Sequence, residues 1–246
     1  MTRIGHKIIS LDLVDSTNNY VANLVKQGSI VHGTVILADE QTNGRGQRGT
    51  IWQTQPGMNL IFSLYVEFDA LAIENQSSIH HWVSLSVIQV LKKIGLTAKI
   101  KWPNDILTEN GKIAGVLIEN LIENQIVKSS IIGIGLNVNQ VEFAENVNAT
   151  SLKLEMGTYF NVKEFAFMLV NELDNKFPKL SIKDYVILKT EYLENLWGMN
   201  EKVNFIRNNS LENGVILGTN DSGLLKVQTV NGVELFDLKE VKFIVD

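Results

Sequence analysis

Near the start of the chain, the spacing of apolar residues changes from a strand pattern to a helix pattern. Apolar and polar positions largely alternate over residues 7–14, which predicts a β-strand. The next four residues, Asp-Ser-Thr-Asn at 15–18, are types that cap the N-termini of helices. Apolar side chains then recur at helical spacing at Tyr20, Val21, Leu24 and Val25. The sequence therefore predicts a strand that leads through a polar cap into a helix.

Further along the chain, predicted strands surround one clear amphipathic helix. Apolar and β-branched runs predict strands at 34–38, 59–68, 98–102, 113–119 and 130–137. A single apolar stripe, formed by Ile79, Val83, Val87, Val90 and Ile94, predicts a helix. Two more helices are expected, one from Asn161 with Glu164 in a capping-box position and one from near Ser181. This arrangement favours an α+β domain with a mixed sheet over a doubly wound one.

From about residue 194 the pattern changes to short strands separated by turn residues. The expected strands are 202–207, 214–219, 224–229, 233–238 and 242–245. Asn231-Gly232 is a strong signal for a type I′ hairpin, and Asp221-Ser222-Gly223 marks a second turn. Short strands at this density favour a small β-barrel. We therefore expect a larger domain over 1–193 and a small barrel over 194–246.

Composition excludes several classes of protein. Of the 246 residues, 45% are hydrophobic and 20% are charged, as in ordinary folded domains. The net charge of -5 does not favour nucleic-acid binding. The absence of cysteine excludes disulfide scaffolds, thiolate metal sites and thiol nucleophiles. The sequence has no signal-peptide core and no apolar run near the ~20 residues of a membrane helix, so a cytoplasmic location is expected.

A polar, glycine-rich stretch between residues 41 and 57 contains the segment Gly44–Gly49, Gly-Arg-Gly-Gln-Arg-Gly. The segment fits the dinucleotide pattern G-x-G-x-x-G, but Trp52, Pro56 and then a strand follow it instead of a helix. What remains is a loop with two arginines and accessible backbone N–H groups, which suits an anion. An ordinary surface loop with solvated charges is the alternative, although the length of the stretch favours a functional loop.

The segment Lys101–Asp105, Lys-Trp-Pro-Asn-Asp, is a second candidate for chemistry. Lys101, at the end of a predicted strand, could steady a developing negative charge. Asn104 and Asp105 could hold a hydrated Mg²⁺. A strand that simply runs into a turn, with Asn-Asp as turn formers, is the alternative.

Two smaller features also leave alternatives open. Ser16, Thr17 and Asn18 suit a helix cap, and the same helix start could bind a polar ring. The glycines at 115, 133 and 135 lie within predicted strands, where a missing side chain marks either the close approach of a ligand or a β-bulge. Other chemistries are excluded, because the chain has no Walker loop, no H-E-x-x-H and no G-x-S-x-G.

Taken together and in this order, these segments resemble the biotin–protein ligases. The matching segments are Ser16-Thr17-Asn18, Gln41 with Gly44-Arg45-Gly46, Trp52, Lys101–Asp105, Lys112–Gly115 and Gly133–Asn137. The C-terminal barrel, with Gly218 and the Gly223-Leu224-Leu225 turn, also corresponds. The resemblance covers essentially the whole chain. It implies a mixed-sheet catalytic domain of the biotin/lipoate ligase type, over 1–193, and an SH3-like barrel over 194–246.

The resemblance also implies a reaction in two steps. Biotin's carboxylate attacks the α-phosphorus of ATP, which gives biotinyl-5′-adenylate and pyrophosphate. A lysine amine in the biotin-acceptor domain of a carboxylase then attacks the mixed anhydride and releases AMP. Because the first step brings anions together, the site must supply positive charge and Mg²⁺.

The site residues follow from the same resemblance. Lys101 and Arg45 would be the catalytic residues. Those expected to bind biotin are Ser16, Thr17, Asn18, Gln41, Gly44, Arg45, Gly46, Gln47, Lys101, Ala114 and Gly115. Those expected to bind the nucleotide are Arg48, Trp52, Asn104, Lys112 and Asn137, and Asp105 would hold the metal ion. The glycine-arginine loop is expected to be mobile until a ligand orders it.

The chain departs from the family pattern in two respects. Gln47 stands where many members carry a second arginine, so weaker retention of the adenylate or greater reliance on Arg48 is expected. The catalytic motif begins by residue 16, without room for the DNA-binding segment of bifunctional members, so we expect a stand-alone ligase without repressor activity or DNA binding.

Three competing interpretations remain. A lipoate-activating ligase could attach a different acid to the same kind of lysine, although the Gly44–Gly49 loop fits the biotin enzymes better. A non-catalytic biotin sensor would bind biotin without releasing pyrophosphate. A general protein-interaction module would leave Arg45 and Lys101 without a purpose.

An exposed strand edge could serve a homodimer and the docking of the acceptor.

Overall fold

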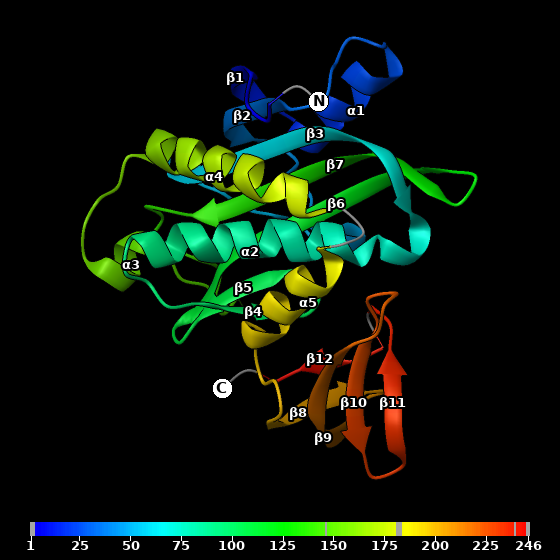
Figure 1. The fold of residues 1–246 in the computed structure, drawn as a ribbon. Helices are drawn as coiled ribbons and strands as arrows, with labels where there is room; N and C mark the ends of the chain where they lie inside the picture. Colours follow the sequence, from blue (N-terminus) through cyan, green and yellow to red (C-terminus); the bar gives the residue numbers. More distant parts are fainter. Residues whose placement is uncertain (1–2, 146, 181–183, 239, 245–246) are drawn as a thin grey trace.

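In the computed structural model, the described residues are 3–145, 147–180, 184–238 and 240–244, with the side chain of Arg48 excepted. They form two β-sheets that follow one another along the chain (Figure 1). The helix start expected near Ser181 lies outside the described residues, which resume just before α5 (Tyr185–Glu194). Among the helices described, none is both long and apolar enough to cross a membrane.

The larger sheet has seven strands in the order β1-β2-β3-β7-β6-β5-β4. The strands are β1 Lys7–Val14, β2 Thr34–Gln41, β3 Asn59–Ala72, β4 Lys99–Lys101, β5 Asp105–Thr108, β6 Gly111–Glu123 and β7 Ile126–Asn137. β1 and β2 are parallel and are connected by helix α1 (Thr17–Lys26), whereas the other neighbours are antiparallel. This mixed sheet confirms the α+β class.

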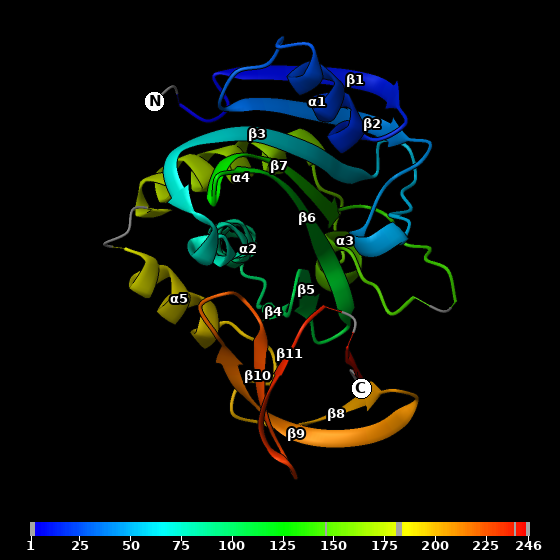
Figure 2. The same cartoon turned by 90° about the vertical axis from the view of Figure 1, so that its right-hand side faces the viewer.

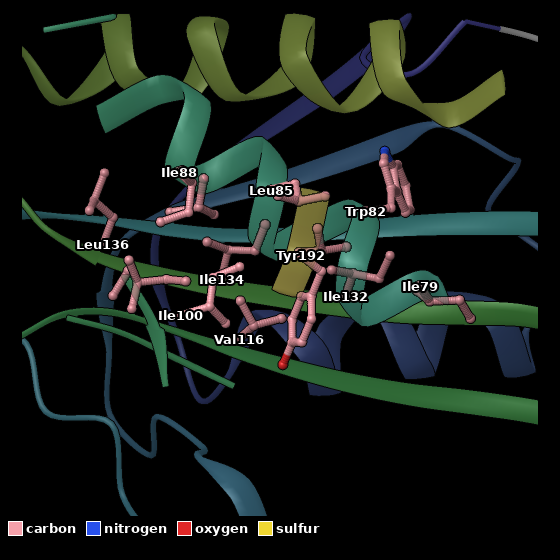
Figure 3. Close-up of a cluster of buried hydrophobic side chains, with 14 of the residues drawn as sticks. Ile79, Trp82, Leu85, Ile88, Ile100, Val116, Ile132, Ile134, Leu136 and Tyr192 are labelled. Atoms are coloured by element: carbon pink, nitrogen blue, oxygen red, sulfur yellow. The ribbon is translucent and has the colours of Figure 1, made fainter. Parts of the chain in front are cut away.

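One face of the larger sheet carries the main hydrophobic core. Helices α2 (Ser77–Lys93), α4 (Val162–Lys176) and α5 cover this face (Figures 1 and 2). Trp82 of α2 and Tyr192 of α5 pack there with alternate residues of the central strands, such as Ile132 and Ile134 (Figure 3). The indole N–H of Trp82 donates to the carbonyl oxygen of Leu173 at 2.9 Å, which ties α2 to α4.

Helix α1 packs on the opposite face of the same sheet. Val21 of α1 forms a small buried cluster with Ile36 and Tyr65, whereas Val35 belongs to the main core. Adjacent strand residues therefore point to opposite faces, as the period of two requires. Helix α1 contacts β2, β3 and β7, so it covers only part of the width of this second face.

The smaller sheet has five antiparallel strands in the order β11-β10-β9-β8-β12. The strands are β8 Lys202–Arg207, β9 Ser210–Thr219, β10 Leu225–Thr229, β11 Gly232–Phe236 and β12 Lys242–Phe243. Phe205 lies at its centre, with ring centroids 5.6 Å from Phe236 and 5.9 Å from Phe243. This sheet confirms the expected small, SH3-like β-domain at the C-terminus.

Backbone hydrogen bonds join β4 of the larger sheet to the segment that leads from α5 into β8. Ile100 of β4 donates its N–H to the carbonyl oxygen of Asn195 and accepts from the N–H of Trp197, each at 2.8 Å. The indole N–H of Trp102 donates to the carbonyl oxygen of Gly223 at 2.9 Å. The segment that begins at Lys101 is therefore held by the larger sheet and by the turn between β9 and β10. The division of the chain at residues 193 and 194 stays a prediction.

Two short elements were not expected from sequence. β5 has four residues and pairs with β4, and α3 (Leu152–Met156) has five. Elements of this length are too short to show a hydrophobic period. Ser151 does cap α3, because its side chain accepts a hydrogen bond from the N–H of Leu154. The expected cap at Asn161 is confirmed, since its side chain accepts from the N–H of Lys163.

The expected turn at Asp221-Ser222-Gly223 forms between β9 and β10, whereas the other expected hairpin turn is displaced. Thr229 pairs with Gly232, so the loop residues are Val230 and Asn231, one position earlier than the predicted Asn231-Gly232 turn. A turn with two left-handed residues occurs instead at Asn208 (φ 51°) and Asn209 (φ 62°). β9 consequently begins at Ser210 rather than at 214. Asparagine tolerates the left-handed region, so an Asn-Asn pair serves where Asn-Gly is the usual signal.

Candidate active site

A cavity of about 550 Å³ lies between the larger sheet and the end of the smaller one. Gly115, Gly133 and Gly135 form part of its floor, at positions that alternate with the core residues of β6 and β7. The expected site residues that line it are Ser16, Thr17, Asn18, Gln41, Arg45, Gly46, Gln47, Trp52, Lys101, Asn104, Asp105, Lys112 and Gly115. Residues distant in sequence therefore meet in one place.

One end of the cavity is polar and is built where β1 runs into α1. Ser16 occupies the N-cap position of α1, but its side chain makes no capping hydrogen bond. The N–H of Thr17 donates to Oε1 of Gln41 at 2.8 Å, which ties α1 to β2. Oγ of Ser63 lies 2.7 Å from Oγ1 of Thr17 and 2.6 Å from Oδ1 of Asn18. The side chains at this end that line the cavity can also form hydrogen bonds to a polar ligand; they are Ser16, Thr17, Asn18 and Gln41.

The glycines of β6 and β7 make room for side chains from other elements. A Cβ atom at Gly133 would lie 2.6 Å from Oδ1 of Asn18, and one at Gly135 would lie 2.3 Å from Cε2 of Trp52. At Gly115 the nearest atom would be Cζ3 of Trp52, at 3.1 Å. The two strands pair in regular register around these glycines, so β-bulges do not explain them. The close approach is made by the side chains that shape the cavity.

The other end of the cavity combines an aromatic ring with charged groups. Nζ of Lys112 lies 5.3 Å from the ring centroid of Trp52, within the range of a cation–π contact. The same Nζ atom pairs with Oδ1 of Asp105 at 2.6 Å. Asn104 donates from Nδ2 to the carbonyl oxygen of Val116 at 2.8 Å, which fixes the turn that carries Asp105.

Lys101 is the cation at this end whose pKa is lowered by burial. It closes β4 and lies opposite Asp105 in the β4–β5 register. Burial lowers the pKa of Lys101, Asp105 opposes this shift, and the positive charges of Lys112 and Lys242 lower the pKa further. A partly desolvated ammonium among other cations gains much from an incoming anion.

The glycine-arginine strap, residues 44–51, closes over the cavity from β2. The N–H of Gly46 donates to the carbonyl oxygen of Thr50 at 2.7 Å, and Arg45 forms a β-bridge with Ile51. The Arg45 guanidinium donates to Oε1 of Glu119 at 2.6 Å and to Oδ1 of Asn19 at 2.8 Å. Arg45 therefore reaches toward the polar end, whereas Lys101 lies with the charged groups at the other end.

Ala114 and Asn137 are expected site residues whose side chains do not line the cavity. Ala114 is fully buried in the hydrophobic core, because it alternates with Gly115 along β6 and faces the helices. Asn137 donates from Nδ2 to the carbonyl oxygen of Thr150 at 2.9 Å, which holds it within the fold. The cavity floor on β6 is thus Gly115, and the expectation for Ala114 is corrected.

Two expected site residues of the strap, Gly44 and Arg48, are not among the described residues that line the cavity. Gly44 is buried and does not line the cavity, and a Cβ atom there would lie 2.2 Å from the carbonyl oxygen of Trp52. Its role is to let the two ends of the strap meet. The side chain of Arg48, expected on the nucleotide side, lies outside the described part of the structure.

The sequence analysis missed residues that the smaller sheet brings to the cavity. Leu238, Val241, Lys242 and Phe243 line it from the C-terminal end of the chain. Lys242 lies between two buried apolar residues, a pattern visible in the sequence, but nothing local indicates which cavity it faces. Ser63 and Glu119, which bond to residues of the polar end, were also not identified.

The acidic side chain at the cavity fits a metal ion that arrives with phosphates. Asp105 is the one acidic residue among the described residues that line the cavity. The described part of the chain contains no group of three or more His, Cys, Asp or Glu side chains able to hold a metal on their own. Mg²⁺ is usually held by one or two carboxylates together with substrate phosphates. Asp105, with the neighbouring Asn104 amide, fits that donor set.

Comparison with known proteins points to one family. The family model described as "Biotin/lipoate A/B protein ligase family" matches residues 10–137. The bifunctional ligase/repressor BirA of Bacillus subtilis is 28% identical over 236 residues, which cover 94% of this chain and 72% of the relative. The biotin–[acetyl-CoA-carboxylase] ligase of Paracoccus denitrificans is 27% identical over 237 residues, with 93% and 97% covered.

A solved structure shows the same architecture. The biotin protein ligase from Aquifex aeolicus, in complex with biotin and ATP, superposes with a TM-score of 0.80. It is 27% identical, and the match covers 98% of this chain and 100% of the Aquifex chain. Both sheets therefore have counterparts in that structure.

Proposed function

Because the chain belongs to the biotin/lipoate A/B protein ligase family, we propose that its cavity activates biotin with ATP and transfers it to a protein lysine. The observation that carries this proposal is the single cavity of about 550 Å³ that Arg45, Lys101 and the polar Ser16–Asn18 segment line together. The chain is an ATP-dependent biotin–protein ligase, in keeping with relatives named for that activity and a similar structure that holds biotin and ATP.

The chemistry has two balanced steps. An oxygen of biotin's carboxylate bonds to the α-phosphorus of ATP, and the bond from that phosphorus to the bridging oxygen breaks, so that pyrophosphate leaves. The acceptor lysine's amine then bonds to the acyl carbon of biotinyl-5′-adenylate, loses a proton, and AMP leaves with the electrons of the anhydride bond. Both steps concentrate negative charge on oxygen, so fixed cations in a water-poor cavity accelerate them.

Lys101 is the first choice for a catalytic residue in this proposal. Its ammonium would contact both the reacting carboxylate and the α-phosphate, where three N–H donors can hold several oxygens at once. Its lowered pKa reflects burial and neighbouring lysines, and both conditions favour an anionic partner. Arg45 is the second choice, because the strap carries it to the polar end of the same cavity.

Biotin's ureido ring would occupy the polar end. Ser16, Thr17, Asn18 and Gln41 offer both donors and acceptors there, which suits a ring with two N–H groups and a carbonyl. Backbone N–H groups of the strap, at residues 45–47, would close over the ligand. Gly115 would leave space for it on the floor.

The nucleotide would occupy the charged end. Trp52, Lys112 and Asn104 would contact ATP, and Lys242 adds a cation from the smaller sheet. Asp105 would hold Mg²⁺ together with the phosphates, and the ion would supply charge neutralisation during phosphoryl transfer. Lys112 keeps Asp105 in place through their ion pair.

The partner and setting follow from the activity. The macromolecular substrate is the biotin-acceptor domain of a biotin-dependent carboxylase, and the reaction belongs to the cytoplasm, where ATP is supplied. Residues 1–193 would form the catalytic domain and 194–246 the barrel domain, which contributes Lys242 to the nucleotide. Self-association through an open sheet edge, which would give a homodimer, is part of the proposal and is tested by solution mass with and without acceptor.

A pyrophosphate-release assay with purified protein, ATP and Mg²⁺ tests the function. Release is expected with biotin and not with lipoate, and addition of an acceptor domain should yield one biotinylated lysine. Lys101→Ala should lose release, whereas Lys128→Ala, an exposed lysine of β7, should retain it. Release driven by lipoate instead would make the chain a lipoate ligase. Biotin binding without release would make it a sensor.

A further inference from the structure

Glu119 is an acidic residue that no part of the proposed chemistry uses. It lies on β6, on the same face as Gly115. Beyond the register shift near Ile113, the even positions of the strand (Ala114, Val116 and Ile118) pack in the core, so the odd positions face the other way. Its side chain is 34% exposed, and it bonds to residues from two other elements. A carboxylate beside a site for anions disfavours substrate binding through its charge. Its presence there therefore calls for a separate role.

Each oxygen of the Glu119 carboxylate serves a different partner. Oε1 accepts from Nη2 of Arg45 at 2.6 Å, and Oε2 accepts from Nδ2 of Asn18 at 2.8 Å. A second, longer contact of 3.4 Å joins Oε2 to Nη1 of Arg45. One carboxylate therefore connects the glycine-arginine strap to the start of α1.

The bond to Asn18 also sets which way its amide points. Nδ2 of Asn18 faces Glu119, so Oδ1 faces Ser63, whose Oγ lies at 2.6 Å. Because a carboxylate only accepts hydrogen bonds, it excludes the flipped amide, in which an oxygen would face an oxygen. The absence of a side chain at Gly133 leaves Asn18 the space that this orientation requires.

We propose that Glu119 is a positioning residue that clamps the strap shut and fixes the Asn18 amide for recognition of the biotin ureido group. The inference rests on the proposed function and adds a residue that acts through its two partners without touching substrate. A single carboxylate thereby couples recognition at the polar end to closure over the product of the first step. Loss of the clamp affects biotin and its adenylate, not ATP.

The substitution Glu119→Gln tests this, because it keeps the shape but replaces one acceptor oxygen with a donor. The amide has one acceptor oxygen, so it cannot accept from Arg45 and Asn18 through two separate oxygens as the carboxylate does. We expect the KM for biotin and the rate of adenylate release to rise at least about tenfold, equivalent to ~1.4 kcal/mol. The KM for ATP should stay near the wild-type value. Glu119→Asp keeps the charge but shortens the side chain, so its KM for biotin and its adenylate release rate should fall between those of the wild type and Glu119→Gln. This variant serves as the test if Glu119→Gln folds poorly.

The matched control is Glu123→Gln, an identical charge change on an exposed residue of the same strand. It should leave both KM values and the release rate unchanged. In an Arg45→Met background, Glu119→Gln should add little to adenylate release, because the clamp is already open. Three results would overturn the proposal. They are equal effects of Glu119→Gln and Glu123→Gln, a rise in the KM for ATP that parallels the rise for biotin, and full additivity of Glu119→Gln with Arg45→Met.

Failure of the proposed function gives a different result. If the wild-type protein released no pyrophosphate with biotin, ligase activity would be refuted. The biotin affinities of Glu119→Gln and Glu123→Gln could still be compared by calorimetry. An unchanged biotin affinity in that comparison would then refute the clamp by itself.

Discussion

Gly135 lies directly beneath the indole ring of Trp52, so closely that a Cβ atom at residue 135 would come within 2.3 Å of Cε2 of the tryptophan. The ring thereby rests on the sheet and forms one wall of the cavity, with Nζ of Lys112 5.3 Å from its centroid. The position of Trp52, which we propose contacts the nucleotide, thus depends on a glycine more than 80 residues away in sequence.

Gly135→Ala should displace Trp52 and weaken ATP binding. A contact under 3.0 Å forces the ring to move, because the β7 backbone is fixed by pairing on both sides. We expect the KM for ATP to rise several-fold with little change in the KM for biotin. Gly115→Ala, where the nearest ring atom would be at 3.1 Å, should have a smaller effect. Equal effects of the two variants would contradict the prediction.

Lys242→Gln should extend activity to higher pH. The positive charge of Lys242 is one cause of the lowered pKa of Lys101, after burial and Lys112. Removing that charge raises the pKa of Lys101, so its protonated form persists further as pH increases. Adenylation rates measured between pH 7 and 10 should show the alkaline decline moved upward. Lys202→Gln, an exposed lysine of β8, is the control and should leave the profile unmoved.

Acid should destabilise the fold through two neighbouring histidines of α2. Burial lowers the pKa of His80 to about 4 and that of His81 to about 3, from an ordinary value of 6.5. Nδ1 of each is buried and has no hydrogen-bond partner among the described residues, and both line a second cavity of about 230 Å³. The unfolded chain therefore binds these protons first, and stability falls as pH decreases from 6.5 toward 4.

The size of this effect is on the order of 1.4 kcal/mol per pH unit for each histidine within that window. Urea unfolding at several pH values should show the decline, and His81→Gln should reduce its slope. His6→Gln, which changes an exposed histidine, should not. A pH-independent free energy of unfolding between pH 4.5 and 7 would refute the assignment.

Gln47→Arg should slow the release of the adenylate. Gln47 belongs to the strap and lines the cavity, where an added guanidinium would reach the proposed phosphate position. A charge-assisted hydrogen bond to phosphate is worth roughly 1.5–3 kcal/mol, so release should slow about tenfold or more. Retention of labelled adenylate on the protein measures this directly. Gln53→Arg adds the same charge at an exposed position, and slowing of the same size there would point to general electrostatics instead.

Local signals identified much of the molecule before any contact was known. The strand at 7–14, the helix start within 15–18 and the strand that ends at Lys101 follow from periods and residue types that act over a few neighbours. The short β5 and α3 were missed because four or five residues do not complete a pattern. The Asn231-Gly232 turn was misplaced by one residue because strand register, not turn propensity alone, sets where the loop falls.

The sequence by itself determined most of the longer elements, that the chain has a mixed larger part and a β-rich end, and which segments carry charge and glycine. Only the tertiary structure decided which side chains share the cavity. Strand alternation turned Ala114 into the core and left Gly115 on the floor, and packing of the two sheets brought Lys242 beside Lys101. Such contacts join residues far apart in the chain, so they depend on register and sheet packing that no local pattern encodes.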